Sequence, residues 1–150
     1  MSKNNFRRPV LAAFGGVLML SAAGMAAAFA GPDYRATLSG SNVPGGGGDR
    51  DGWGRVRFEI NQSTHRLCAD LEVRSIAEVT SAQIYRGHEG QVGDPVARLE
   101  RPRDDDSYDC KQIGVALAQE IMADPAGFYV AVNTTEYPNG AIRGQINPAG

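Results

Sequence analysis

The 150-residue sequence is poor in the residues that most often carry enzyme and metal chemistry, with two histidines, two cysteines and one tryptophan. A zinc site takes four ligands, usually thiolates and imidazoles. A nucleophilic triad needs a base and an orienting group beside its nucleophile. His65, His88 and two cysteines supply neither set. We therefore predict no enzyme, no catalytic residue, no metal site and no cofactor.

Long apolar runs are absent except at the N-terminus. That segment begins with three basic residues, Lys3, Arg7 and Arg8, and continues with an apolar stretch over residues 10–29. It ends with Ala28-Phe29-Ala30, which has the small residues of a cleavage site. This pattern predicts a signal peptide over residues 1–30 and a secreted or periplasmic domain over residues 31–150. An uncleaved anchor is the alternative, because about 20 apolar residues can span a bilayer. The arginine pair leaves both the general and the twin-arginine export routes open.

Positive charge is also scarce. Cleavage would remove three of the 15 basic residues and none of the 17 acidic ones, so the formal net charge would fall from −2 to −5. Nucleic acids and anionic membranes select basic surfaces. We therefore expect no nucleic-acid partner and no stable membrane insertion after cleavage. The stretches at residues 49–52 and 104–109, which contain several aspartates, lack the spacing of a calcium loop and are expected to be solvated loops.

The two cysteines form an even pair in a chain that is expected to be exported. Such a pair predicts a disulfide between Cys68 and Cys110. Alternation puts Cys68 on the strand face of Asp70, opposite Leu71. The bond is therefore expected to tie the loop at residues 104–109 across a strand, outside the main core.

Apolar and polar residues alternate in several short segments separated by turn residues, as is typical of half-buried strands. These segments are residues 34–38, 55–60, 67–73, 82–85, 96–99, 128–133 and 142–146. Residues 115–123 break the alternation and suit about two turns of helix that end before Pro125. The predicted fold is all-β, an antiparallel β-sandwich or barrel of about seven or eight short strands with one short helix.

The last segments predict a C-terminal hairpin. Asn139-Gly140 is a two-residue turn signal, because both residue types tolerate positive φ. The alternation around it predicts a set of core residues, namely Phe128, Val130, Val132, Ile142 and Ile146.

Four blocks of the sequence resemble the CHRD family, whose domain was first described in chordin. They are Ala36-Thr-Leu-Ser-Gly40 with Val43-Pro44, Leu67-Cys-Ala-Asp-Leu71, Ala82-Gln-Ile-Tyr-Arg-Gly-His-Glu-Gly90 with the Gly93-Asp-Pro-Val96 that follows, and Asp124 through Gln145. The resemblance implies a domain with no established chemistry that has a binding or structural role outside the cytoplasm. The expected partner is an extracytoplasmic protein, a polysaccharide or another copy of the chain.

The sequence departs from this family at three positions. Family members typically carry His-Ile-His in a central strand and a further His in the penultimate strand, and the matching residues here are Gln83, Tyr85 and Asn133. Residues at i and i+2 share a strand face, but amides are poor ligands for zinc or copper without imidazole or thiolate partners. A copper- or zinc-linked redox or metal-binding protein, descended from a His-bearing member, is the alternative hypothesis.

The same three positions still predict a polar, hydrogen-bonding face. We therefore predict a candidate binding face made of Gln83, Tyr85, Asn133 and Arg143. An arginine on a strand can bind a carboxylate or phosphate with two hydrogen bonds. The alternative role for Arg143 is to pair with an acidic residue or to cap loop carbonyls.

Overall fold

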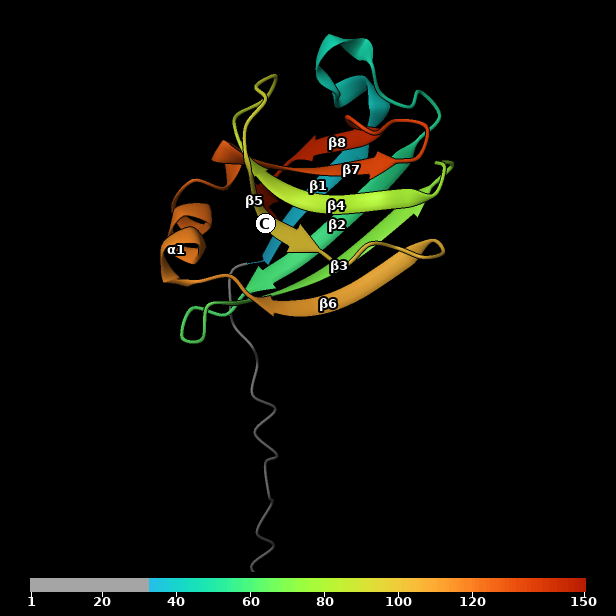
Figure 1. Ribbon diagram of the computed structural model, residues 1–150. Coiled ribbons are helices and arrows are strands. Elements are labelled where there is room, and N and C mark those ends of the chain that lie inside the picture. The colour runs from blue at the N-terminus through green and yellow to red at the C-terminus, as the bar shows by residue number, and fades with distance from the viewer. Residues whose placement is uncertain (1–32) are drawn as a thin grey trace, which may run out of the picture.

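Nine strands and one α-helix make up residues 33–150, the part of the chain that the computed structural model describes (Figure 1). The strands are β1 (Asp33–Ser39), β2 (Trp53–Ile60), β3 (Arg66–Arg74), β4 (Val79–Arg86), β5 (Pro95–Leu99), β6 (Asp106–Gln112), β7 (Phe128–Thr134), β8 (Ile142–Gln145) and β9 (Asn147–Pro148), and the helix is α1 (Val115–Ala123). The predicted signal peptide lies outside the described residues. None of the helices within residues 33–150 is long and apolar enough to span a membrane.

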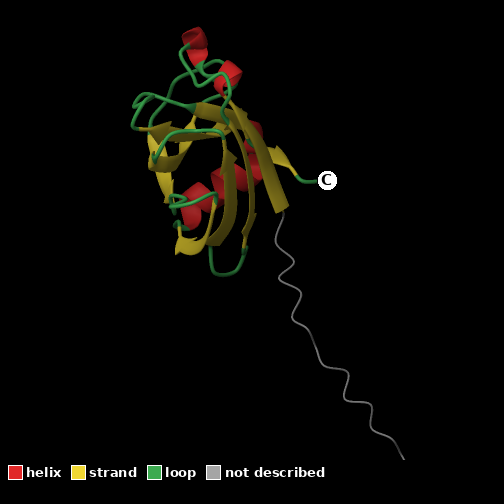
Figure 2. Cartoon of the chain, turned by 90° about the vertical axis from the view of Figure 1, so that its right-hand side faces the viewer, coloured by secondary structure: helices red, strands yellow, loops and turns green. Residues whose placement is uncertain are grey.

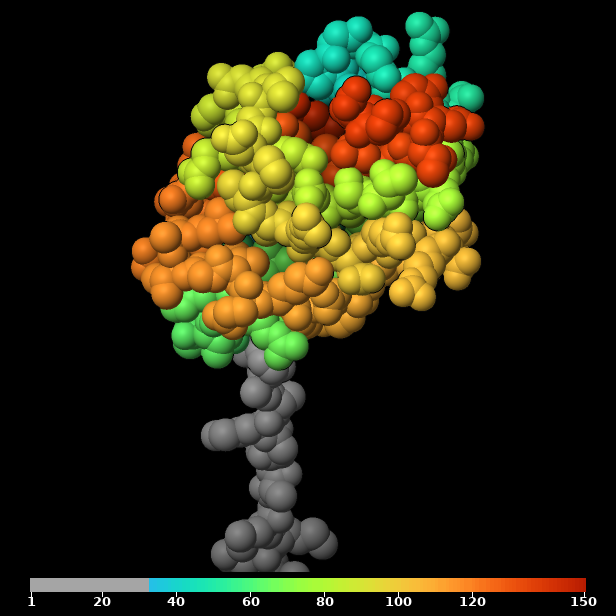
Figure 3. All heavy atoms as spheres, in the orientation of Figure 1, coloured from blue at the N-terminus to red at the C-terminus, as the bar shows by residue number. Residues whose placement is uncertain are grey.

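The strands form one antiparallel sheet that curls into a nearly closed barrel. Their order is β5-β4-β7-β8-β1-β2-β3-β6, and β9 pairs with β1. The two end strands are β5 and β6, and side chains of β6 contact Glu100, the residue that follows β5. The hydroxyl of Ser107 donates to the carbonyl of Glu100 at 2.7 Å, and Lys111 Nζ lies 3.9 Å from a carboxylate oxygen of Glu100. Figure 3 shows the atoms of these two segments, in yellow and orange, next to each other. The predicted fold class is confirmed.

Strand alternation fills the interior of the barrel. The five predicted core residues of the C-terminal hairpin are all buried, and Val130, Val132, Ile142 and Ile146 are fully inaccessible. Helix α1 lies where it was predicted and buries Ala118 and Ile121 against this core. Figure 1 shows the helix beside one end of the strands, and in Figure 2, turned by 90°, it is seen through the ring that the strands form. It therefore covers an end of the barrel that the strands leave open.

Strand β6 corrects the sequence prediction, which placed residues 104–109 in a loop. Its inward-facing residues are Ser107, Asp109 and Lys111, all partly buried and all polar, because they face the seam with β5 and not the apolar core. Cys110 lies directly opposite Cys68 of β3, and their Cα atoms are 3.9 Å apart in a disulfide. The bridge lies outside the core, as predicted, but it joins two adjacent strands.

The turn of the C-terminal hairpin also differs from its prediction. Strands β7 and β8 pair as a hairpin, but residues 135–141 connect them. Pro138 and Asn139 form the centre of a turn that the Gly140 amide closes by donating to the Tyr137 carbonyl at 3.2 Å. Proline pre-sets the first central position of such a turn. Pro138 therefore moves the turn back by one residue, and Gly140, with φ 131°, follows it.

Candidate functional site

The outer face of β4, β7 and β8 carries the four residues that the sequence predicts as a binding face. They are Gln83 and Tyr85 on β4, Asn133 on β7 and Arg143 on β8. The register places Ala131 of β7 between Gln83 and Arg143. The small side chain of Ala131 on the middle strand therefore separates the larger side chains of Gln83 and Arg143 on the two flanking strands.

Three of the four residues contact one another through polar groups. The hydroxyl of Tyr85 donates to the amide oxygen of Gln83 at 2.8 Å. Burial raises the pKa of Tyr85, a side-chain hydrogen bond with Asn133 lowers it, and Tyr129 raises it again. The family positions that typically carry histidine are thus neighbours here, joined by amide and phenol groups.

An aromatic stack continues from Tyr85 across the face. The rings of Tyr85 and Tyr129 are nearly parallel, at an angle of 5°, with centroids 5.1 Å apart. The guanidinium carbon of Arg143 lies 3.4 Å from the centroid of Tyr129, a cation–π contact. Tyr129 is buried and was not predicted as part of the face, although its outward position in the alternation of residues 128–133 was a signal for it.

Arg143 holds a loop over this stack. It is only 4% exposed, and its guanidinium donates to the carbonyls of Gln91 at 2.5 Å and His88 at 3.1 Å. Burial lowers the pKa of Arg143, whereas Tyr129 and Glu89 raise it. Of the two roles considered for Arg143, the geometry matches the capping of loop carbonyls. Two of its donors are committed within the molecule and its side chain is buried, so the face presents chiefly its uncharged polar groups.

Neighbouring segments enclose a hollow of about 320 Å³ on this face. Ala131, which has a small side chain, is one of its lining residues. Other lining residues include Tyr85, Asn133, the highly exposed Val92 and Asn139 of the hairpin turn. Gln83 lies outside this hollow and lines a separate depression with Arg98. The hollow therefore offers amide, phenol and apolar groups suited to binding an uncharged polar ligand.

Metal-ligating side chains are dispersed in the structure. Within residues 33–150 no group of three or more histidine, cysteine, aspartate or glutamate side chains is placed to hold a metal ion. His88 lies in the loop beside the face, with its Nε2 3.9 Å from a carboxylate oxygen of Asp124, and both side chains are exposed. His65 lies in the turn before β3, at φ 55°.

Comparison with known proteins matches the chain to one family. The family model of the CHRD domain covers residues 34–146, from β1 through the residue that follows β8. No curated protein and no solved structure matches the chain.

Proposed function

Because the chain belongs to the CHRD domain family, we propose that it is an exported, non-enzymatic protein that binds a partner outside the cytoplasm. The binding surface is the outer face of β4, β7 and β8. A domain of extracellular type and a disulfide between two strands support the proposed location. The partner is an extracytoplasmic protein or polysaccharide.

The observation that carries the binding role is the hollow beside the Tyr85–Tyr129 stack. Its lining is held in place by the stack and by the loop that Arg143 caps, so little side-chain freedom is lost when a ligand enters. Concave sites of this kind orient a ligand with a few convergent polar groups. Tyr85 and Asn133 are the groups placed to do so.

Substitutions on this face are expected to weaken binding without unfolding the domain. Asn133→Ala removes a partly exposed amide, and Tyr85→Phe removes a hydroxyl but keeps the ring stack. Each should change the free energy of unfolding by no more than about 1 kcal/mol. Capture of a partner from the exported fraction by immobilised protein should fall for both variants.

Val130→Ala is the matched control on the inner face of the same strand. It should cost about 1–3 kcal/mol, because Val130 is fully buried and its truncation leaves a cavity. The molecules that remain folded should still capture the partner. The assignment of the two faces fails if Asn133→Ala is as destabilising as Val130→Ala, or if both face variants capture as well as the wild type.

Export is tested separately by intact mass. Protein recovered from the periplasm or the medium should have the mass of a chain that begins at Gly31. Recovery in the membrane fraction, at a mass that includes residues 1–30, would establish the anchor alternative instead.

Metal analysis of the purified protein separates this proposal from the metal-linked alternative. Stoichiometric copper or zinc would favour that alternative.

A further inference from the structure

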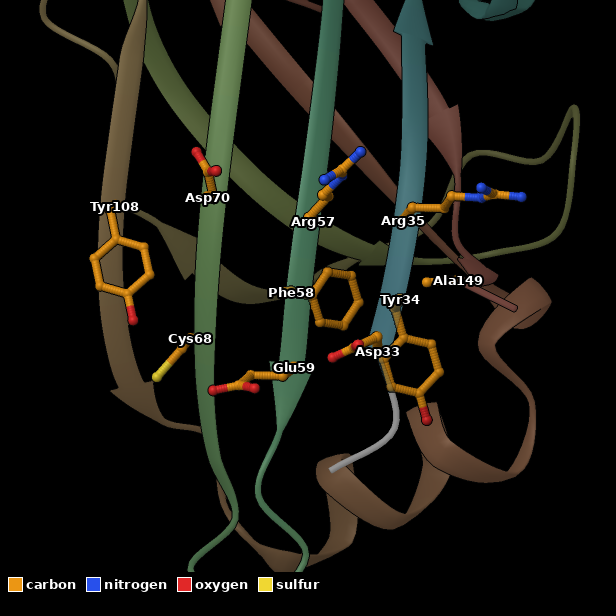
Figure 4. A pocket seen from close by; sticks show the side chains of 10 residues that line it. All are labelled: Asp33, Tyr34, Arg35, Arg57, Phe58, Glu59, Cys68, Asp70, Tyr108 and Ala149. Carbon is orange, nitrogen blue, oxygen red and sulfur yellow. The ribbon is translucent and has the colours of Figure 1, made fainter. Parts of the chain in front are cut away.

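The outer face of β1, β2, β3 and β6 carries side chains in two adjacent rows that run across the strands (Figure 4). The first row is Asp33, Glu59, Cys68 and Cys110, and the second is Arg35, Arg57, Asp70 and Tyr108, each residue opposite the next across the sheet. These rows lie around a shallow depression of about 410 Å³. This face belongs to different strands from the proposed binding face.

Like charges lie next to one another within each row. Asp33 is directly opposite Glu59, and Arg35 is directly opposite Arg57. Such pairs destabilise a sheet when nothing neutralises them. None of these four residues forms an ion pair with another residue in the described part of the chain. Figure 4 shows the guanidinium of Arg57 turned away from Asp70.

The charges in the next row along β2 and β3 behave differently. Glu72 forms ion pairs with Arg55 and with Arg74, the latter at 2.8 Å. The sheet can therefore neutralise outward-facing charges by ion pairs within the molecule. It does not do so for Asp33, Arg35, Arg57 and Glu59 in the two rows described above. On β1 and β2, these rows place an acidic pair two residues along each strand from a basic pair.

We propose that this face binds the same face of a second copy of the chain. The two-fold axis lies in the plane between the sheets, parallel to the rows and midway between them. Such an axis places each strand over the same strand of the second copy, running in the opposite direction. The first row of one copy then lies against the second row of the other. Asp33 of one copy then faces Arg35 of the other, and Glu59 faces Arg57. This is the self-complementarity that a two-fold interface requires.

The rest of the face fits the same symmetry. Tyr108 is 69% exposed, and its hydroxyl lies 3.3 Å from Cys110 Sγ. The exchange of rows puts the Tyr108 ring of each copy against the disulfide of the other. On β3, Arg66 precedes the first row by two residues and Glu72 follows the second row by two residues. These two residues have opposite charges, and the same axis places Arg66 of one copy against Glu72 of the other. Opposite charges thus meet along β1 and β2 and at the outer positions of β3, Asp70 faces Cys68, and the aromatic ring meets sulfur on β6.

The test is the oligomeric state of the purified protein, measured by sedimentation velocity over a range of concentrations. The wild type should form a dimer that weakens about tenfold or more in 1 M salt, where the screening length falls to about 3 Å. Arg57→Glu should raise the dissociation constant about 100-fold or more, because it puts two carboxylates face to face. Glu59→Arg should do the same with two guanidinium groups.

Charge exchange distinguishes this interface from any other. The double variant Arg57→Glu with Glu59→Arg should dimerise again, and an equimolar mixture of the two single variants should form the mixed dimer. Arg98→Glu, the same charge change on β5, should leave the dissociation constant unchanged. Melting temperatures verify that each variant is folded.

Three results would each overturn the proposal. They are a wild type that stays monomeric at low salt and high concentration, single variants that dimerise as well as the wild type, and single variants that fail to associate when mixed. Because Gln83, Tyr85 and Asn133 lie on other strands, partner capture by the proposed binding face can succeed or fail independently.

Discussion

Gly144→Ala is expected to cost the domain about 3 kcal/mol, at the upper end of what overpacking costs. A Cβ atom at this position would lie 2.1 Å from the carbonyl oxygen of Thr37 and 2.7 Å from its carbonyl carbon. Both are backbone atoms of β1. That strand cannot move aside, because it pairs with β2 along its whole length, from Asp33 to Ser39. The added methyl group must therefore push β8 away from β1.

This contact joins β8 to β1 in the middle of the strand order. In the described sheet, β8 pairs with β1 at a single register position, where Arg143 lies opposite Ser39. Close approach at Gly144 supports that position, and Arg143 in turn caps the loop over the proposed binding face. Separation of β8 from β1 should therefore loosen the face as well as lower stability.

Urea unfolding of the purified protein measures the loss. Gly47→Ala is the matched control, because nothing lies within 4 Å of an added Cβ there and its φ is negative. It should change the free energy of unfolding by about 0.5 kcal/mol or less. Equal stability of the two variants would mean that the strands separate at little cost.

Removal of the disulfide is expected to have the other large effect. The double variant Cys68→Ala with Cys110→Ala should lose up to about 4 kcal/mol, by the loop-entropy model, for the 42-residue separation of the two cysteines. Strand β6 should loosen first. It ends the sheet, and its inward residues are polar ones that contribute little to the core. The seam between β5 and β6 should open with it.

Two measurements check this expectation. The wild type should show no free thiol when titrated under denaturing, non-reducing conditions. Hydrogen exchange of the double variant should accelerate mainly in residues 106–112, whereas β7 should stay protected because both of its neighbours remain paired. Two reactive thiols in freshly exported protein, or unchanged stability of the double variant, would contradict it.

The sequence was informative wherever one face of a strand packs on the core. The alternation of Val56, Phe58 and Ile60 with charged residues identified β2, and the same pattern identified β3 and β7. Burial selects apolar residues at every second position. Residues 115–123 were identified as a helix for a related reason, since the break in alternation and Pro125 mark its extent. The positions of Gln83, Tyr85 and Asn133 on neighbouring strands followed from the family resemblance.

By itself, then, the sequence determined the strands that bury apolar side chains, the cysteine pair and the family. Only the tertiary structure decided the features that depend on contacts between distant segments. Strand β6 was missed because its inward residues face a polar seam, so its sequence shows no apolar alternation. The role of Arg143 depends on carbonyls of Gln91 and His88, more than 50 residues away. The paired charge rows on β1 and β2 become visible only through strand register, which sets residues far apart in the sequence side by side.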